Sequence, residues 1–237
     1  MPASRGHRPP PRSTVPKLTK QEIVAAAIEI ADQEGVDAVS MRKVAGAIGS
    51  GTMSLYRHLA DREELLDAML DVVYSELDLP DRSIADWRAR LEQIAQAQRR
   101  MLSLHHWVAA LVGSRPPLLP GFLRYFEASL RTLLDAGLEI TEAAGVSATV
   151  NAFVVGYALL EHSEHEARRR TGLNKRQWRA RNAPLVNQIL RSRDYPAVAQ
   201  YVKHAQDIDP DTAFNIALTN ILHTALVGTR GPTDPAR

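Results

Sequence analysis

The chain has 237 residues, of which 45% are hydrophobic and 24% are charged. This length allows one large domain, or a small domain followed by a medium one. The sequence contains no cysteine, which excludes a disulfide framework, a thiolate metal site and a cysteine nucleophile, and suits the reducing cytoplasm where we expect the protein. The formal net charge of +2 is nearly balanced, so composition alone does not indicate a nucleic-acid binder.

The two ends of the chain, residues 1–17 and 229–237, are predicted to be disordered. Met1–Pro16 contains five prolines, three arginines and no acidic residue, so nothing in it can form an apolar core. We interpret it as a basic arm that adds non-specific phosphate contacts, or else as an inert leader. It has no apolar stretch of the kind found in secretory signals.

The first predicted helix spans Leu18–Gly35. Thr19 and Glu22 have the spacing of a capping box, and Gly35 is placed to end the helix at the C′ position. Apolar residues recur along one face of this segment at helical intervals. The pattern predicts an amphipathic helix with one buried face.

The next segment, Ser40–Leu59, has the pattern of a helix-turn-helix. Ala45 is a small residue where the two short helices would touch, Gly49 allows the positive φ of the turn, and Leu55 forms an apolar plug under the second helix. The second helix offers polar side chains to base edges and phosphates. On spacing alone, an ordinary αα-corner in a helical protein is the alternative interpretation.

Charge is unevenly distributed around this motif. A second capping signal, Asp61-x-x-Glu64, opens a long amphipathic helix after it. Leu18–Leu77 carries five Lys/Arg against eleven Asp/Glu, but the acidic residues lie on the first and the last of these helices. Local potential, rather than net charge, decides which face meets a phosphate backbone. The helix-turn-helix therefore remains a candidate DNA-binding surface.

Leu18–Leu77 closely resembles the N-terminal DNA-binding domain of the TetR family of bacterial transcriptional regulators. Several motifs recur in the family's order and spacing: Thr19-x-x-Glu22, the Gly35 stop, and residues 40–45 (SMRKVA), 48–49 (IG), 55–59 (LYRHL) and 61–66 (DREELL). Many members carry Tyr-Phe where this chain has His58 and Leu59. The Tyr-x-His form found here looks more like the tetracycline-repressor branch.

The resemblance implies DNA-contact roles for particular residues. In similar proteins the residue at Arg42 reaches a base from the helix before the turn, and Lys43 adds positive charge beside it. Arginine can contact guanine N7 and O6 together, and a methionine side chain can touch a thymine methyl. The residues expected to line the major groove are Thr52, Met53, Ser54 and Arg57, and those expected to hold phosphates are Tyr56, His58 and Arg62.

After a hinge at Pro80–Ser83, the rest of the chain is predicted to be helical. The expected helices span Asp86–Val112, Phe122–Ala136, Thr141 to about Arg170, and Asp209 to Gly228. Seven basic residues and no acidic residue lie in Arg168–Arg181. A solvated loop or helix end is the simpler interpretation of this run, and a second nucleic-acid site is the alternative.

The C-terminal half resembles the tetracycline-repressor type of regulatory domain. The cues are residues 113–116 (GSRP), the helix end at residues 134–138, Phe153-x-x-Gly156 and Phe214-x3-Leu218. In such proteins a long helix and the last helix form a four-helix interface with their copies, and two reading heads roughly 34 Å apart then read a palindrome. The residues expected at this interface are Ala148, Ala152, Gly156, Phe214, Leu218, Ile221, Leu222 and Leu226.

The resemblance also implies a small-molecule pocket whose occupation changes the separation of the reading heads. In tetracycline repressors a histidine that helps to coordinate a magnesium–drug complex occupies the position of Leu111, which argues against tetracycline itself. Each pocket candidate has simple core packing as its alternative. The candidates are Trp87, Ile94, Gln98, Met101, Leu102, Trp107, Leu111, Arg115, Phe122, Phe126, Tyr157 and Glu161.

No sequence motif supports an enzyme. The chain has no Gly-rich phosphate loop, nucleophile elbow or HExxH, and we expect no cofactor and no metal. His162 and His165 could share a helix face, but a solvated helix end is the simpler interpretation. The uncharged run Ala143–Leu160 is diluted by polar residues, so we expect a buried helix and no membrane contact.

We therefore predict an all-α protein with a three-helix, helix-turn-helix DNA-binding domain over residues 18–79 and a larger helical ligand-binding and dimerisation domain over residues 80–228. The predicted function is that of a homodimeric repressor, released from a palindromic DNA operator by a small-molecule effector. The alternatives are an activator or ligand-independent regulator of the same fold, and a helical small-molecule-binding protein of a different class.

Overall fold

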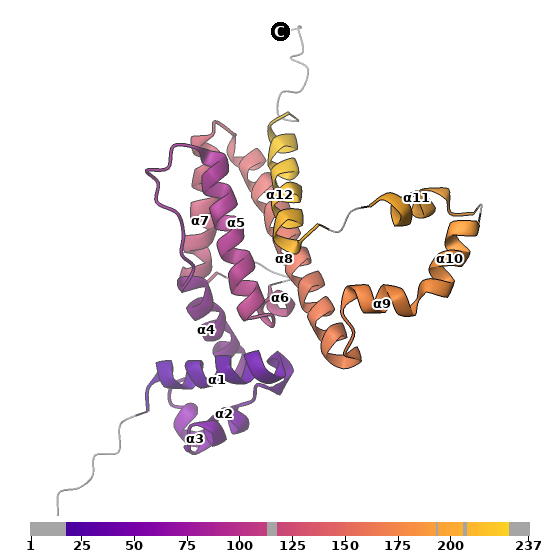
Figure 1. Ribbon diagram of the computed structural model, residues 1–237. Helices are drawn as coiled ribbons and strands as arrows, with labels where there is room; N and C mark the ends of the chain where they lie inside the picture. Colours follow the sequence, from indigo (N-terminus) through magenta and orange to yellow (C-terminus); the bar gives the residue numbers. More distant parts are fainter. Residues whose placement is uncertain (1–17, 113–117, 193, 206–207, 228–237) are drawn as a thin grey trace, which may run out of the picture. The chain divides into compact units, whose positions relative to one another are not determined.

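The computed structural model describes residues 18–112, 118–192, 194–205 and 208–227. Within these ranges the chain forms helices and no strand (Figure 1), so the all-α prediction is confirmed. The helices are α1 (Lys20–Glu34), the 3-10 helix η1 (Val36–Ala38), α2 (Met41–Ala47), α3 (Thr52–Leu55), α4 (Arg62–Ser75), α5 (Trp87–Leu104), α6 (Val108–Leu111), α7 (Pro120–Asp135), α8 (Ile140–Thr171), α9 (Lys175–Arg181), α10 (Ala183–Arg191), α11 (Pro196–His204) and α12 (Pro210–Val227). The predicted terminal arm and tail and the GSRP break lie outside the described residues.

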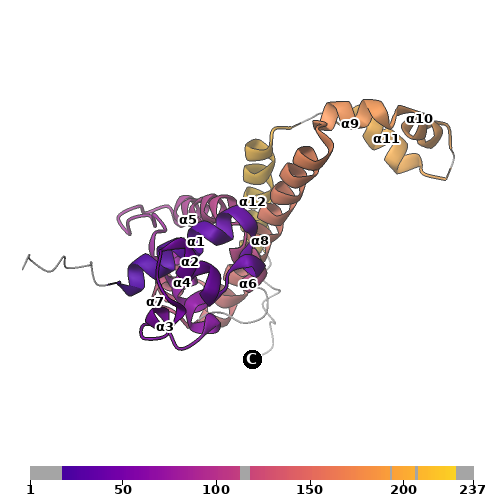
Figure 2. The same cartoon turned by 90° about the horizontal axis from the view of Figure 1, so that it is seen from below.

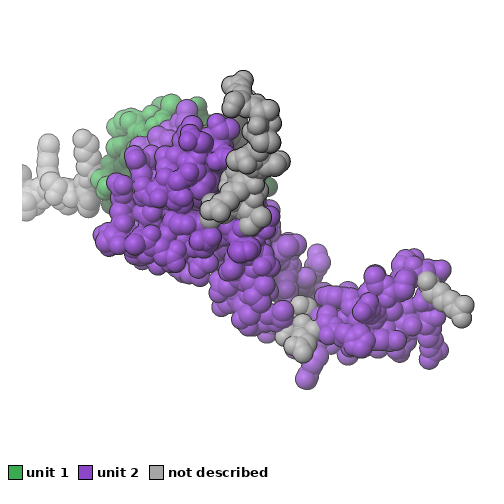
Figure 3. Space-filling model, turned by 90° about the horizontal axis from the view of Figure 1, so that it is seen from above, with its two compact units in different colours: residues 1–69 green, residues 70–237 purple. Residues whose placement is uncertain are grey.

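The chain divides into two compact units, residues 1–69 and 70–237 (Figure 3). The boundary falls inside α4, rather than after residue 79 as the sequence predicts. The second half of α4 belongs to the larger unit because it is tied to the first turn of α7. There the backbone N–H of Gly121 donates to a carboxylate oxygen of Asp71 at 2.7 Å.

The predicted helix ends of the smaller unit are confirmed. The hydroxyl of Thr19 accepts from the backbone N–H of Glu22 at 3.2 Å, and the Glu22 carboxylate accepts from the N–H of Thr19 at 2.9 Å. Gly35 ends α1 with φ 86°, and Gly49 turns the chain between α2 and α3 with φ 65°. Ser40 caps α2 through its side chain. A β-carbon would be strained at both glycines.

In the larger unit, α5, α7 and α8 pack on one another and α12 lies against α8 (Figures 1 and 2). The prediction of a single helix over Asp86–Val112 is wrong. The chain leaves the helical conformation at His105 (φ −119°, ψ 64°), and a second helix, α6, begins at Val108. This break turns the chain so that Trp107 is buried. The cap of α8 is Glu139, which forms a capping box with Glu142, rather than Thr141.

The apolar helix α8 is, among the described residues, the one helix long and apolar enough to cross a membrane by length and composition. Ala143, Val150 and Val154 of this helix are buried in the bundle, but most of its apolar stretch is not buried. The prediction of a buried helix therefore holds for one face of α8 only. After α8, the short helices α9, α10 and α11 contact one another in sequence. The described side chains of the basic run at the end of α8 and on α9 are nearly all exposed, as a solvated helix end would be.

Candidate functional site

The second helix of the helix-turn-helix, α3, packs one face against the core of the smaller unit and exposes the other face to solvent. Leu55 and Leu59 are fully buried, as predicted for the plug beneath the helix. On the outer side Met53 is 76% exposed and Tyr56 is 48% exposed. Burying such large side chains normally stabilises a fold. Their exposure here is consistent with a binding surface.

Two arginines lie in the open part of this surface. Arg42 on α2 and Arg57 after α3 are both exposed, and an Nη2 hydrogen of Arg57 donates to the hydroxyl of Ser54 at 3.1 Å. Thr52 and His58 are half-buried beside them. The segment thus presents cationic, hydroxyl, aromatic and apolar groups together, which is the set that major-groove recognition uses.

The other two cationic residues predicted to contact DNA, Lys43 and Arg62, bond to groups within the smaller unit. Lys43 pairs with Glu34. Nε of Arg62 donates to the carbonyl of Val39 at 2.8 Å, and its Nη2 donates to the carbonyl of Val36 at 2.9 Å. Arg62 therefore anchors the end of η1 through these two donors, and its phosphate contact stays a prediction. No local pattern signals this role, because the partners lie more than twenty residues upstream.

In the larger unit, a buried polar cluster joins three helices. Gln98 of α5 is fully buried, its Oε1 accepts from the hydroxyl of Tyr125 on α7 at 2.9 Å, and its Nε2 donates to Oδ1 of Asn151 on α8 at 2.6 Å. Of these three residues, only Gln98 is among the predicted pocket residues. Tyr125 is buried, as a core tyrosine would be, and Asn151 is half-buried within the uncharged stretch of α8.

Aromatic rings surround this cluster. Tyr74 of α4 is fully buried, with its ring centroid 5.2 Å from that of Phe122 and 5.7 Å from that of Tyr125. Phe126 stacks on Phe122 at 6.0 Å. Burial raises the pKa of Tyr74 to about 12, and hydrogen bonding to the Gln98 side chain partly offsets this rise. Three predicted pocket residues, Gln98, Phe122 and Phe126, are therefore brought together around two tyrosines that were not predicted.

A second group of predicted pocket residues lies around Arg99, which is not itself one of the predicted residues. Its guanidinium pairs with Glu161 on α8 and, at 2.9 Å, with Asp211 on α12. It also lies 4.4 Å from the ring centroid of Phe214 and 5.2 Å from that of Tyr157. Hydrogen bonding to Glu161 raises the pKa of Arg99. Arg99 thus connects three helices beside a cavity of about 640 Å³ that it lines with Glu161.

The remaining pocket candidates are dispersed. Ile94, Met101, Leu102 and Trp107 are buried core residues. Trp87 and Leu111 are half-buried, and the side chain of Arg88 lies over the Trp87 ring at 4.4 Å. Arg115 lies outside the described residues.

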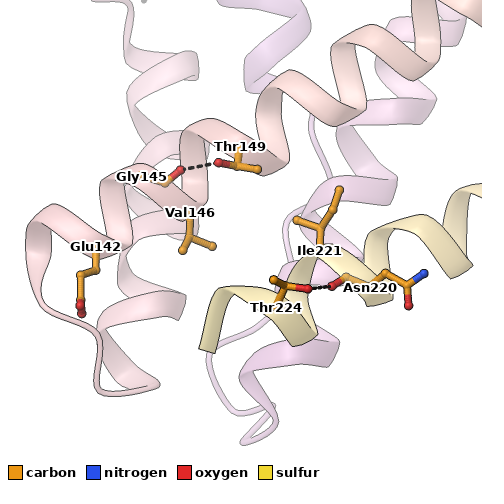
Figure 4. Close-up of a pocket in the computed structure, with 7 residues that line it drawn as sticks. All are labelled: Glu142, Gly145, Val146, Thr149, Asn220, Ile221 and Thr224. Carbon is orange, nitrogen blue, oxygen red and sulfur yellow. Dashed lines mark hydrogen bonds between the residues drawn. The ribbon is translucent and has the colours of Figure 1, made fainter. Parts of the chain in front are cut away.

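The outer face of α8 and α12 contains an open apolar groove of about 620 Å³ (Figure 4). Ala148 and Ala152 are exposed on α8, and a β-carbon at Gly156 would meet no atom within 4 Å. The residues that line the groove are Glu142, Gly145, Val146 and Thr149 from α8, and Asn220, Ile221 and Thr224 from α12. Of the predicted interface residues, Ile221 is thus in the groove and the small residues lie along the same helix.

Three other predicted interface residues point inward instead. Phe214, Leu218 and Leu222 are buried in the chain's own core, and the ring of Phe214 stacks on Phe153 at 5.2 Å. The prediction that they contact a partner is wrong, because α12 uses this stripe to pack on α8. The side chain of Leu226 lies outside the described residues. Among the residues that the structure describes, no group of three or more His, Asp or Glu could hold a metal ion.

Two family models match the chain, one in each part of the sequence. Residues 23–69 match the family model of bacterial regulatory proteins of the tetR family, and residues 79–224 match the model of the tetracyclin repressor-like C-terminal domain. The chain belongs to the TetR family. It is therefore a DNA-binding transcriptional regulator of helical fold, and its relatives are regulators rather than enzymes.

Similar TetR family proteins include a repressor and a structurally known regulator. The HTH-type transcriptional repressor DrrR1 of Streptomyces coeruleorubidus is 37% identical over 217 residues, covering 91% of this chain and 80% of that protein. Apo ActR from Streptomyces coelicolor has a TM-score of 0.75 at 28% identity, covering 91% of this chain and 98% of ActR. ActR in complex with actinorhodin has a TM-score of 0.73 at 29% identity, covering 89% and 98%.

Proposed function

We propose that this TetR family regulator is a cytoplasmic repressor that binds a palindromic operator as a homodimer and is released by a small-molecule effector. The observation that carries the repressor assignment is the likeness to DrrR1, a named repressor, over nearly the whole chain. The solved complex of ActR with actinorhodin supports an effector site in the larger unit. The loss of DNA affinity then follows from differential binding of the effector to two arrangements of the dimer.

We propose that the operator is read by the exposed face of α2 and α3. Arg42 and Arg57 are proposed to contact base edges because their side chains are exposed, with the exposed Met53 and the half-buried Thr52 and Ser54 beside them. Tyr56 and His58 are proposed to hold phosphates. Lys43 and Arg62 are left out of the base-reading set, since their donors are engaged by Glu34 and by backbone carbonyls.

We propose that a second copy of the chain covers the groove between α8 and α12. Apolar surface of this kind is costly to leave in water, and small residues along α8 permit close helix approach. A single recognition helix also reads few bases, so two related by a dyad are needed for useful specificity. The predicted interface residues that this arrangement retains are Ala148, Ala152, Gly156 and Ile221.

A gel-shift titration with DNA from beside the protein's own gene tests the regulator. We expect a discrete complex with a palindrome-containing fragment that survives excess non-specific competitor, since base contacts add to the salt-dependent phosphate term. A fragment with one half-site scrambled is the control. Failure to bind any palindrome-containing fragment at low salt would contradict the proposal.

Sedimentation of the full chain tests the dimer. Ala152→Glu introduces a charge on the exposed face of α8, one turn from Thr149 in the groove, and we expect it to shift the protein toward monomer. Gln200→Glu, an equally exposed change on α11, is the matched control and should leave the dimer intact. Equal sedimentation of the two variants as dimers would place the interface elsewhere.

A further inference from the structure

We propose that Asp71 of α4 and Arg124 of α7 are the positioning residues that pass the effector-bound state of the larger unit to the DNA-reading helices. Their side chains join the last turn of α4 to the first turn of α7, and we call this pair of contacts the α4–α7 clamp. The inference rests on the proposed function, because it explains how an effector in the larger unit changes operator affinity. Neither residue is among those predicted from the sequence to contact DNA or the effector.

The C-terminal end of α4 is capped by Arg124, which comes from a different helix. The last carbonyl groups of a helix have no partner within that helix and need donors from elsewhere. The Nη2 group of Arg124 donates to the carbonyls of Ser75 at 2.7 Å and Leu77 at 2.8 Å. A cation at this end also interacts favourably with the helix dipole. Arg124 is exposed, so these contacts, rather than burial, account for its position.

The N-terminal end of α7 is capped in return by α4. Leu119 occupies the N-cap position without a side-chain hydrogen bond. Because Pro120 has no N–H, the N–H of Gly121 is the first in the helix that needs an acceptor. Oδ1 of Asp71 accepts from it at 2.7 Å, and a carboxylate at a helix N-terminus is electrostatically favourable. Each of the two helices therefore caps the end of the other.

The two capped turns are also in direct backbone contact. A β-carbon at Gly121 would overlap the backbone of Asp71 and of Ser75, so there is no room for a side chain between the helices at this point. Close-packed backbones with a charged cap on each side have little freedom to slide past one another. The last turn of α4 therefore follows a displacement of α7.

The opposite end of α4 is anchored in the DNA-reading unit. There Glu64 pairs with Lys20 of α1 at 2.9 Å. Arg62 donates to the carbonyls of Val36 and Val39. Between these anchors and the clamp, α4 contains no glycine or proline, which are the usual sites at which a helix bends. A continuous helix fixed at each end to a different unit transmits a displacement from one unit to the other.

Helix α7 is also in position to respond to an effector. It packs on α5 and α8, and these three helices carry most of the predicted pocket residues. An effector that binds among them changes the packing of α7, and the clamp carries that change to α4. Coupling between two binding sites is reciprocal, so operator binding has to act on α7 in turn. This reciprocity allows tests that do not require the effector.

Urea unfolding of the full chain, followed by two signals, gives the first test. All three tryptophans lie in the larger unit, so their fluorescence follows that unit, whereas circular dichroism follows the helices of both. We expect coincident transitions in the wild type. Arg124→Gln should place the dichroism midpoint about 0.5 M urea below the fluorescence midpoint. Arg131→Gln, whose partner is Glu127 of the same helix, is the matched control and should keep the transitions coincident.

Substitutions of Asp71 separate a role in the clamp from a general loss of stability. Asp71→Asn keeps a side-chain oxygen that can accept from the N–H of Gly121, whereas Asp71→Ala does not. We therefore expect coincident transitions for Asp71→Asn and separated transitions for Asp71→Ala. If Arg124→Gln and Asp71→Ala lower both midpoints equally, the contacts are only structural and the inference fails. Separated transitions in the wild type would overturn it as well.

Hydrogen exchange with and without operator DNA gives the second test. In the wild type we expect operator binding to slow exchange in the first turns of α7, which belongs to the larger unit, by about threefold. Arg124→Gln should still form the operator complex but lose this protection, and Arg131→Gln should keep both. Protection of α7 that survives Arg124→Gln, or that is absent from the wild type, contradicts the inference.

Failure of the clamp and failure of the proposed function give different results. The unfolding test contains no DNA, so it reports on the clamp alone. A missing operator complex, with separated unfolding transitions in Arg124→Gln, would remove the proposed function and leave the clamp. A normal operator complex, with coincident transitions in every variant, would do the reverse.

Discussion

The two units of this regulator place their polar side chains in opposite ways. Among the described residues, the buried side chains of residues 18–69 are apolar, whereas every buried polar or charged residue belongs to the larger unit: Arg90, Gln98, Ser129, Thr132 and Ser147. The DNA-reading unit keeps its polar groups outside a conventional core, so binding and stability can be altered separately. In the larger unit, polar groups within the core make recognition and stability depend on the same residues.

The largest effect expected from this comparison is at Gly121 in the larger unit. A β-carbon there would lie 2.5 Å from the carbonyl oxygen of Asp71 and 2.8 Å from the backbone N of Ser75, so Gly121→Ala must separate α7 from α4. We expect it to lower the free energy of unfolding by about 3 kcal/mol, measured by urea denaturation. Gly46→Ala in α2, where a β-carbon meets no atom within 4 Å, is the control and should raise stability by about 0.5 kcal/mol. Similar values for the two variants would show that α4 and α7 do not pack this closely.

Arg62 is an exception in the DNA-reading unit, because this cationic side chain donates hydrogen bonds to the unit's own backbone. Arg62→Ala leaves the carbonyls of Val36 and Val39 without their charged donor, so we expect a loss of about 2 kcal/mol in the free energy of unfolding. Circular dichroism in urea measures this. Unchanged stability together with weaker DNA binding and a smaller salt slope would instead assign Arg62 to a phosphate.

Arg57 shows the general behaviour of the DNA-reading unit. Its side chain is exposed and its described hydrogen bond is to Ser54, so Arg57→Ala should leave the unfolding free energy nearly unchanged. We expect it to weaken specific operator binding by about 1.5 kcal/mol, measured by competition gel shift. An equal loss on specific and non-specific DNA would mean that Arg57 contacts only phosphate.

The smallest expected effect is the pH dependence of the α4 cap. The N–H of Ala60, and then Lys20, lower the pKa of the exposed Glu64 carboxyl from its ordinary value of 4.5. A lowered folded-state pKa means that the stabilisation is present above about pH 4.5 and is lost as pH falls through the lower value. Glu64→Gln should therefore lower the midpoint temperature slightly at pH 7 and have no effect at pH 2. An equal effect at both pH values would exclude the carboxylate as the cause.

Much of the smaller unit could be predicted from the sequence, because its signals are local. The capping box of Thr19 and Glu22, the positive φ at Gly35 and Gly49, and the buried plug at Leu55 each depend on residues a few positions apart. Side chains near in sequence are near in a helix, so spacing fixes their geometry. The exposed reading face follows, since the opposite face of α3 has to be buried.

Which polar side chains meet inside the larger unit was decided only by the tertiary structure. The hydrogen bonds of Gln98 to Tyr125 and to Asn151 join residues more than twenty positions apart. The same holds in the smaller unit for the bond of Arg62 to Val39. Likewise, the apolar stripe of α12 has the same spacing whether it faces a partner or its own core. Helical periodicity identifies a buried face but not what covers it, and that choice is made by the packing of the whole bundle.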